Sequence, residues 1–472
     1  MLSALFEHPL TPKQQEVLDY RGDHLLIKGI AGSGKTTVLL RKAKKIVEEE
    51  HGSTIAVFTY NTTLASYAEM LAKMISPNRI KVFTFHSWAF QQLRTMRVRV
   101  SPVDDREKQH LIIQAAAAVA QGKQNRLLDM RKYLEFMEDE ISWIKGKGMT
   151  TLPEYLNSPR TGRGGKVRVL EIDKAAIFEV YVMYQQLLRA ARKNDYDDFA
   201  LMILNDLGNF PLSGQYDHIF IDEAQDLQQT QLNLLRIAAR KSLFIAADKG
   251  QKIYKTSFAW KDVGINILGG RTKILQNTFR STKQIISLAH SLQKHDPVCR
   301  NRDEDYVEPV YPDIEGATPQ MLVCSGELEE KRVINRLASS IYKANPEYTV
   351  GILCRFWSDI RDIKYSLEEY GLKPEIIQKD KGNCHAPGIK LTTFHSAKGL
   401  EFDAVIIARF NDGIVPFIEE DTQEIEEHIA VERRLLYVSL TRAKKQLYMV
   451  CSGAQSTFAK EFDASLFNMV KA

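Results

Sequence analysis

A glycine-rich loop near the start of the chain constrains its fold more than any other feature. The loop runs from Gly29 to Thr36 with the sequence GIAGSGKT, which fits the pattern GxxxxGK[ST]. An apolar run at 24–28 precedes it, and residues 36–50 follow with apolar side chains on one helical face. A strand, a glycine-rich loop and a helix in this order predict an α/β domain with a parallel sheet.

The same loop predicts a nucleotide site. Glycine lets backbone N–H groups surround a phosphate at the start of the helix. Lys35 would reach the β- and γ-phosphates of ATP, and the Thr36 hydroxyl would ligate Mg²⁺. We expect eight residues of this segment to contact the nucleotide: Gly29, Ala31, Gly32, Ser33, Gly34, Lys35, Thr36 and Thr37.

A second motif supplies carboxylates. The apolar run 219–221 ends in Asp222 and Glu223, within the sequence IFIDEAQD. Asp222 would hold Mg²⁺, and Glu223 would orient and deprotonate the attacking water. An acidic strand end by itself is more often a surface turn, but beside a phosphate loop it indicates hydrolysis of a nucleoside triphosphate.

Strand-like and helix-like segments alternate over most of the chain and divide it into domains. The alternation holds at 1–93, stops in the helical stretch 94–192, returns at 193–268 and continues over 269–472. We therefore expect two α/β domains with parallel sheets. The first is built from 1–93 and 193–268 and interrupted by a helical insertion, and the second is 269–472.

Composition excludes several classes of protein. With 44% hydrophobic and 26% charged residues, the chain is not intrinsically disordered. No apolar run reaches the roughly 18 residues of a membrane span, and the N-terminus does not resemble a signal peptide. Five separated cysteines without a CxxC pair argue against disulfides or a zinc site. These features predict a cytoplasmic protein without a membrane partner.

The basic charge is localised. Residues 94–174 hold 16 Lys and Arg against 11 Asp and Glu, so the whole net charge of +5 falls there. Such an excess is typical either of a solvated helical face or of a surface for a polyanion. The loop that contains Arg160, Arg163, Lys166 and Arg168 could contact a phosphate backbone, and a mobile linker is the alternative.

Nine segments in order resemble the motifs of the UvrD/Rep-like superfamily 1 DNA helicases. They are LTPKQQ (10–15), FTYNTTLA (58–65), TFHS (84–87), DYDDF (195–199), DEAQD (222–226), ADKGQKIY (247–254), FRST (279–282), LTTFHSAKGLEFDAVII (391–407) and ERRLLYVSLTRAKK (432–445). Together with the glycine-rich loop they extend over nearly the whole chain. The resemblance implies two RecA-like domains of the P-loop NTPase class.

The resemblance also implies roles around ATP. Gln14 would read the adenine, Phe279 would stack on it, and Glu401 would face the ribose. Gln251 would sense the γ-phosphate. Arg280 and Arg442 would be arginine fingers, since a guanidinium is always charged and can bond a phosphate twice. Both fingers belong to the second domain and the phosphate loop to the first, so ATP would bridge them.

Single-stranded DNA is expected across both domains, where bases stack on aromatic rings without regard to sequence. The residues implied are Thr59, Asn61, His86, Tyr254, Trp260, Lys261 and His395. A lone Trp is also a common core residue, so a packing role for Trp260 stays open.

Two of the departures from the larger relatives affect the expected function. Thr37 stands where many of them have an Arg against the adenine, which predicts weaker discrimination between bases. Only residues 356–390 separate the segment ending at Arg355 from Leu391, where those relatives insert an accessory domain. We expect that domain to be missing, and the chain alone to be a monomer.

The sequence thus predicts an ATP-dependent motor on DNA. It would translocate 3′→5′ on single-stranded DNA, unwind tailed duplex DNA and use ATP with Mg²⁺. A second hypothesis is an ATP-gated DNA-binding subunit that licenses a partner nuclease without translocating. A small-molecule phosphotransferase is a third, for which no acceptor site is evident.

Overall fold

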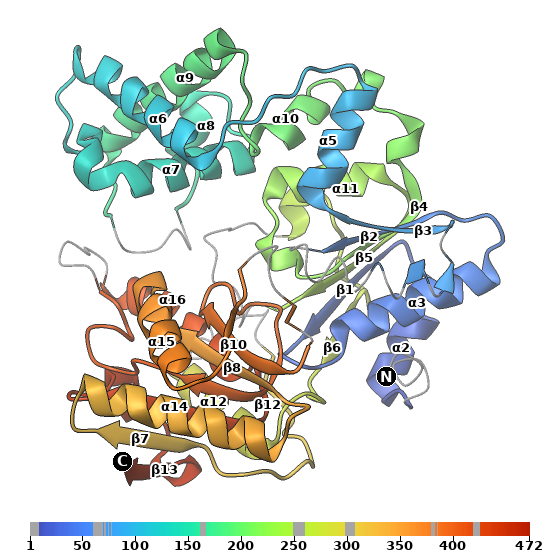
Figure 1. Cartoon of the computed structure of the whole chain (residues 1–472). Helices are drawn as coiled ribbons and strands as arrows, with labels where there is room; N and C mark the ends of the chain where they lie inside the picture. The colour runs from blue at the N-terminus through green and yellow to red at the C-terminus, as the bar shows by residue number, and fades with distance from the viewer. Residues whose placement is uncertain are drawn as a thin grey trace.

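The computed structural model describes most of the chain. The described residues are 9–59, 69, 72, 73, 75, 76, 78–160, 167–248, 260–297, 307–378, 383, 384, 386–418 and 425–472, without the side chain of Lys261. Two α/β domains lie one above the other in Figure 1, and a separate group of helices lies beside the first and above the second. Within these residues, no helix is long and apolar enough to cross a membrane.

The first domain is built on a six-stranded parallel sheet. Its strands, in spatial order, are β3 (Ile80–Thr84), β2 (Ile55–Thr59), β4 (Tyr216–Ile221), β5 (Ala239–Ala247), β1 (His24–Gly29) and β6 (Thr272–Leu275). All five side chains of β2 are buried, as expected for a strand covered on both faces. Helices α2 (Pro12–Asp19), α3 (Lys35–Glu49), α5 (Phe85–Thr95), α10 (Asp198–Leu204) and α11 (Gln229–Ala238) cover the sheet.

One strand of this sheet comes from beyond the predicted domain boundary. Residues 272–275 fall in the segment assigned to the second domain, yet they form β6 and pair with β1. The sequence Thr-Lys-Ile-Leu gives little signal because β6 is an edge strand on which only Leu275 is buried. The chain therefore leaves the first sheet after Leu275 rather than at 268.

The second domain has a seven-stranded parallel sheet. Its strands, in spatial order, are β13 (Asn468–Lys471), β7 (Gln320–Cys324), β12 (Ala443–Ser452), β11 (Phe402–Ile407), β8 (Thr349–Cys354), β10 (Gly388–Thr393) and β9 (Glu375–Ile376). Its helices are α12 (Lys283–Gln293), α14 (Glu327–Ala344), α15 (Trp357–Glu369) and α16 (Ile425–Leu440). Between β8 and β10 the described residues form α15 and β9.

The helical insertion has a core of its own. It comprises α6 (Asp105–Ala120), α7 (Met130–Lys147), α8 (Leu152–Asn157) and α9 (Glu171–Ala191), packed around buried residues such as Met137 and Tyr184. The chain enters and leaves it side by side. Asn194 N donates to Ser101 O at 3.0 Å, and Val103 N donates to Asn194 O at 2.9 Å. The insertion is thus joined to the first domain through two adjacent connecting segments.

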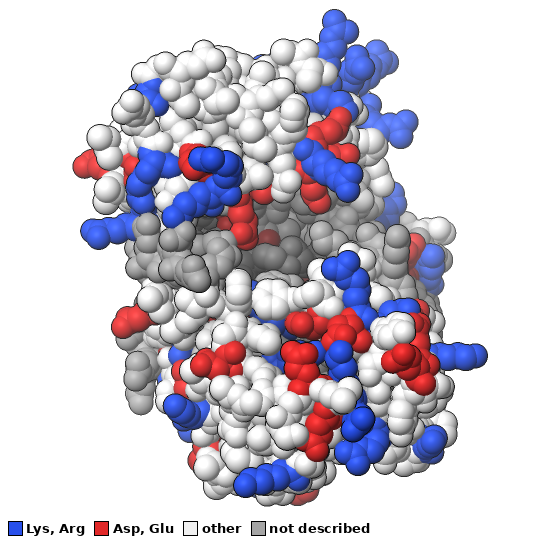
Figure 2. All heavy atoms as spheres, turned by 60° about the vertical axis from the view of Figure 1, so that its left-hand side comes forward, with Lys and Arg blue, Asp and Glu red and all other residues white. Residues whose placement is uncertain are grey.

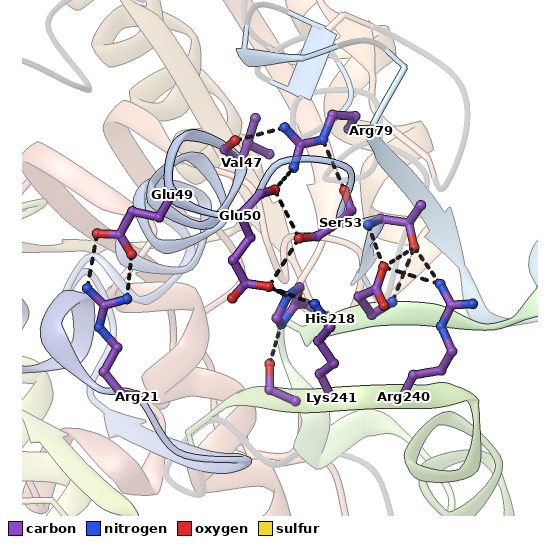
Figure 3. A network of polar contacts seen from close by, with 12 residues as sticks. Arg21, Val47, Glu49, Glu50, Ser53, Arg79, His218, Arg240 and Lys241 are labelled. Carbon is purple, nitrogen blue, oxygen red and sulfur yellow. Dashed lines mark hydrogen bonds and ion pairs between the residues drawn. The ribbon is translucent and has the colours of Figure 1, made fainter.

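A polar network ties together the amino-terminal edge of the first sheet (Figure 3). We call it the basal network; its members are Glu50, Ser53, Thr54, Arg79, Asp217, His218, Arg240, Lys241 and Ser242. Glu50, which follows α3, accepts from Lys241 at 2.9 Å and lies 3.1 Å from His218 Nε2. The network connects the end of α3 to the starts of β4 and β5.

Candidate functional site

The glycine-rich loop lies between β1 and α3, at the carboxyl edge of the first sheet. Gly32 and Gly34 have φ of 73° and 78°, in the left-handed region that favours glycine. A Cβ atom at Gly32 would lie 2.7 Å from Arg280 Cβ and from Thr278 Oγ1. Glycine at this position therefore lets the segment that carries Arg280 approach the loop.

Lys35 is buried inside that loop. Its ammonium donates to the carbonyl oxygens of Gly29 and Ile30 at 2.8 and 3.0 Å. Asp248, which follows β5, lies 3.5 Å away. The ammonium thus sits within the segment that the motif predicts to hold phosphates.

The predicted metal ligands meet beside it. Thr36 Oγ1 donates to Asp222 Oδ2. Burial and the charge of Glu223 raise the pKa of Asp222 to about 6. Burial would also raise the pKa of Glu223, but Lys35 and Lys398 hold that pKa below its usual value. A hydroxyl and carboxylate oxygens are ligands that suit Mg²⁺, so Thr36 and Asp222 fit the ion.

Both predicted arginine fingers come to this edge. Phe279 N donates to Gly32 O at 2.9 Å, which places Arg280 next to the loop. Arg280 Nη2 lies 2.6 Å from Glu401 Oε1. Arg442 is buried and donates to the carbonyl oxygen of Val438 at 2.9 Å. Burial, with the nearby Arg280 charge, lowers the pKa of Arg442 to about 10.

Glu401 forms ion pairs with basic side chains of the second domain. Besides Arg280, it pairs with Lys444 Nζ at 3.1 Å. Burial opposes ionisation, but these two cations lower the pKa of Glu401 to about 2. Glu401 is therefore a fixed anion beside the two arginines.

A buried ion pair joins the two domains. Lys398 Nζ lies 2.7 Å from Asp226 Oδ1, and both side chains are almost fully buried. Asp226 ends the DEAQD segment, and Lys398 belongs to the segment 391–407. Our sequence reasoning assigned no role to this pair, although each residue lies in a recognised motif.

Gln14, the residue predicted to contact adenine, lies on α2, and each end of this helix is fixed by hydrogen bonds. Gln14 is in the first turn of α2, forms a capping box with Thr11, and donates from Nε2 to Ser33 O at 3.2 Å. At the other end of α2, Lys42 of α3 donates to the carbonyl oxygens of Leu18, at 2.7 Å, and Tyr20. Lys42 was not predicted, because a lysine in a helix gives no sequence signal for carbonyl binding.

Three predicted ATP contacts remain: Phe279 and Thr37 border this loop, and Gln251 is not described. The Phe279 ring is 52% exposed and thus accessible to a base. Thr37 is half-buried on the first turn of α3. Gln251 lies outside the described residues.

The predicted DNA contacts of the first domain are partly described. Thr59 is buried at the end of β2, and His86 lies in the first turn of α5. The ring of His86 meets Tyr196 edge-on, with centroids 5.7 Å apart, and Tyr196 is 48% exposed. Asn61 and Tyr254 lie outside the described residues, as does the side chain of Lys261.

Tyr196 is a residue that the sequence reasoning missed. It is the exposed aromatic residue of the segment DYDDF, in which Phe199 is buried, and we recognised this segment only as acidic. An exposed ring beside a motif histidine is suited to stacking on a base.

Trp260 and His395 differ in exposure. Trp260 is half-buried in a short 3₁₀ helix, Trp260–Val263, and packs against the apolar core of the first domain. Trp260 thus has a packing role in the first domain. His395, which follows β10, is exposed.

The basic loop does not present Arg160 to a ligand. Arg160 binds the buried carboxylate of Glu140, with a second contact at 3.0 Å, and stacks over the Trp143 ring at 5.4 Å. It therefore neutralises a buried acid within the insertion. Arg163 and Lys166 lie outside the described residues.

Two family models match the chain. The UvrD/REP helicase N-terminal domain matches residues 10–263, and the UvrD-like helicase C-terminal domain matches 376–453. The first match alone covers more than half of the chain. The chain is thus a two-domain P-loop protein of the RecA-like type, and it belongs to the UvrD/Rep helicase family.

Curated relatives agree with this assignment. The ATP-dependent DNA helicase UvrD1 of Mycobacterium tuberculosis (strain ATCC 25618 / H37Rv) is 26% identical over 307 residues, which are 60% of this chain and 39% of the relative. The ATP-dependent DNA helicase PcrA of Staphylococcus aureus (strain NCTC 8325 / PS 47) is 25% identical over 318 residues, 62% and 41% of the two chains. The match thus spans about two fifths of each relative's length.

A solved structure was also found, described as the C-terminal domain of a possible DNA helicase from Lactobacillus plantarum WCFS1. It is 24% identical and covers 40% of this chain and 98% of its own, with a TM-score of 0.30. That score is too low to support an argument about fold or function.

Proposed function

We propose that this chain is an ATP-dependent DNA helicase that translocates 3′→5′ on single-stranded DNA as a monomer. The observation that carries the proposal is the meeting of the two domains at the phosphate loop. Arg280 packs against Gly32, and Arg442 lies close enough to Arg280 to lower its own pKa. A site divided in this way can convert a change in the nucleotide into a movement between domains.

Each residue then has a chemical task. Lys35 and the loop N–H groups would bind the phosphates, while Thr36 and Asp222 would hold Mg²⁺, which would neutralise phosphate charge. Glu223 stays ionised because of Lys35 and Lys398, so it can take a proton from water. Arg280 and Arg442 stabilise charge that develops on the γ-phosphate.

The buried pair between Lys398 and Asp226 supports coupling to DNA. Lys398 follows the exposed His395 by three residues, and Asp226 follows Glu223 by three. A shift of the second domain would therefore act on both the catalytic carboxylate and the proposed DNA contact. DNA bound near His395 would in turn favour one arrangement of Glu223.

The short connection between β8 and β10 limits unwinding. It consists of α15 and β9 among the described residues, which leaves no accessory domain to hold a duplex there. We propose that the isolated monomer translocates well and unwinds long duplexes poorly. Processive unwinding of hundreds of base pairs in a single turnover would contradict this proposal.

Displacement of a tight block tests translocation and its direction. Streptavidin is placed on a biotin at the 5′ or the 3′ end of an oligonucleotide, and its release is followed with ATP. We expect rapid release from the 5′ end, slow release from the 3′ end, and neither with Glu223→Gln. ATP hydrolysis without release from either end would instead favour the ATP-gated switch that licenses a partner nuclease.

A further inference from the structure

We propose that an arginine surface at the junction of the first domain and the helical insertion binds the phosphate backbone of duplex DNA. The proposal rests on the proposed DNA-dependent function and adds a second DNA-binding surface to it. The surface consists of Arg94, Arg97, Arg99, Arg106, Arg189 and Arg192, all of them exposed. Lys and Arg also gather along the upper right edge of the face in Figure 2, in the half with the insertion.

Backbone pairing brings these residues together from two distant segments. Pro102 forms a parallel bridge with Asn194, and Ser101 N donates to Asn194 Oδ1 at 2.9 Å, so the two connecting segments meet here. Arg99 and Arg192 each stand two residues before the Ser101 and Asn194 pair. A hydrogen bond from Asn194 N to Ser101 O, at 3.0 Å, fixes this alignment.

The remaining arginines extend the same surface. Arg97 N donates to Arg94 O at 3.0 Å where α5 ends, and Arg192 N donates to Arg189 O at 3.0 Å where α9 ends. Arg106 lies in the first turn of α6, beside Glu107, whose carboxylate binds Lys193 at 3.2 Å. Both connecting segments and the adjoining helix ends therefore carry guanidinium groups.

These guanidinium groups have no carboxylate partner in the described part of the chain, in contrast to the paired Arg160. The Arg94 guanidinium lies over the Phe90 ring, 6.0 Å from its centroid. Among the acids at this junction, Asp104 and Asp105 are exposed at the start of α6, and Glu107 pairs with Lys193. Asp195 and Asp197, which follow Asn194, pair with Lys108. The sequence placed the excess of basic charge at 94–174, and the structure shows that part of it converges here without neutralisation.

A duplex suits this surface better than a single strand does. Proteins that hold single strands add exposed aromatic rings for stacking, whereas duplex backbones are held mainly by cations. The exposed aromatic residue nearby, Tyr196, belongs instead to the contact with His86. His86 is in the first turn of α5 and Arg94 is near its end, so about 12 Å of helix separates the proposed strand contact from the surface.

The test compares two triple variants of the full chain by fluorescence anisotropy over a series of salt concentrations. One combines Arg97→Gln, Arg99→Gln and Arg192→Gln. The matched control combines Arg332→Gln, Arg336→Gln and Lys343→Gln on α14, where the same number of exposed cations is removed. The probes are a blunt duplex of mixed sequence and a short oligo-dT, and circular dichroism checks that both variants fold.

We expect the junction variant to bind the duplex at least tenfold more weakly at low salt. The slope of log affinity against log salt should fall by about 0.9 for each phosphate that the variant no longer neutralises. Affinity for oligo-dT and the ATPase rate on poly-dT should equal those of wild type, and the control variant should bind the duplex normally.

Three results would overturn the inference. They are unchanged duplex affinity, an equal loss for oligo-dT, and an equal loss in the control variant. Weaker binding of an acidic protein by the junction variant, with unchanged duplex affinity, would assign the surface to that class of partner instead. Failure of the proposed function is distinct, because the wild-type ATPase would then be indifferent to poly-dT whatever the junction variant does.

Discussion

The two edges of the first sheet both hold charged side chains, but they arrange them in opposite ways. At the amino-terminal edge, opposite charges meet: Asp217 accepts from Thr54 N at 2.9 Å and pairs with Arg240 at 3.2 Å. At the carboxyl edge, ion pairs such as Lys35 with Asp248 are also present, but here like charges lie next to each other as well. Burial with Glu223 raises the pKa of Asp222 to about 6, and burial with Arg280 lowers that of Arg442 to about 10.

The two edges of the same sheet therefore serve different purposes, one stability and the other function. A network of paired charges stabilises the folded state and does not need a ligand to neutralise it. Adjacent like charges cost folding energy and can be relieved by a ligand of opposite charge, for which we propose a magnesium nucleotide. Variants at the carboxyl edge should therefore change chemistry, and variants in the basal network should change stability.

The largest effect is expected from Lys35→Ala. The phosphates would lose their main positive ligand, and DNA-dependent ATP hydrolysis should fall by ~10³-fold or more. Steady-state ATPase assays with poly-dT measure this loss, and the melting temperature without nucleotide serves as the control. Hydrolysis near the wild-type rate would remove Lys35 from the site.

Glu223→Gln should slow hydrolysis by about 10²- to 10⁴-fold while ATP and DNA still bind. The amide keeps the size of the side chain but cannot take the proton from water. Single-turnover hydrolysis, together with binding of a fluorescent ATP analogue, separates the two effects. A normal rate would show that another group is the base.

At the opposite edge, His218→Gln should leave kcat unchanged and lower the free energy of unfolding by about 1–3 kcal/mol. His218 lies 2.7 Å from Ser242 Oγ and 3.1 Å from Glu50, and a glutamine cannot reach both. Denaturant unfolding measures the change in stability, and ATPase assays measure kcat. A large loss of kcat would break the separation between the edges.

The pH dependence sharpens the same test. Burial lowers the pKa of His218, although Glu50 opposes the shift, and Lys241 and Asp217 also face the ring. Because the unfolded histidine binds its proton near pH 6.5 and the folded one at lower pH, stability should fall as pH drops below about 6.5. His218→Gln should lose this part of the pH dependence, measured as unfolding free energy between pH 8 and pH 5.

The smallest effect concerns Thr37. A Thr37→Arg variant would place a guanidinium on the first turn of α3, where the family resemblance implies a contact with the adenine. Such a contact with a base is worth about 0.5–1 kcal/mol, so preference for ATP over CTP should rise two- to fivefold. The ratio of kcat/KM for the two nucleotides measures it, with Thr37→Ser as the control.

The sequence predicted those parts of the fold whose signal is local. The strands at 24–28 and 219–221 are apolar because both faces are covered, and they lead directly into the phosphate loop and Asp222. The strands β6 and β13 gave no comparable signal, because their side chains are mostly outside the core. Edge strands are specified by pairing with a neighbour rather than by an apolar run.

Contacts between distant segments explain what else was missed in the site. Arg160 could not be recognised as a structural residue before Glu140 was seen beside it. Lys398 and Asp226 are 172 residues apart, and only the packing of the two domains reveals the pair. Residue types and spacing identify a motif, but they do not show which charges a fold neutralises.

Stimulation of ATP hydrolysis by single-stranded DNA tests the central claim most directly. The ATPase rate of the purified chain is measured at low salt with and without poly-dT, and again as salt is raised. We predict a low rate alone, a strong increase with poly-dT, and loss of that increase with salt as cations replace protein contacts to phosphate. A rate indifferent to poly-dT at low salt would contradict a DNA motor and favour a small-molecule phosphotransferase.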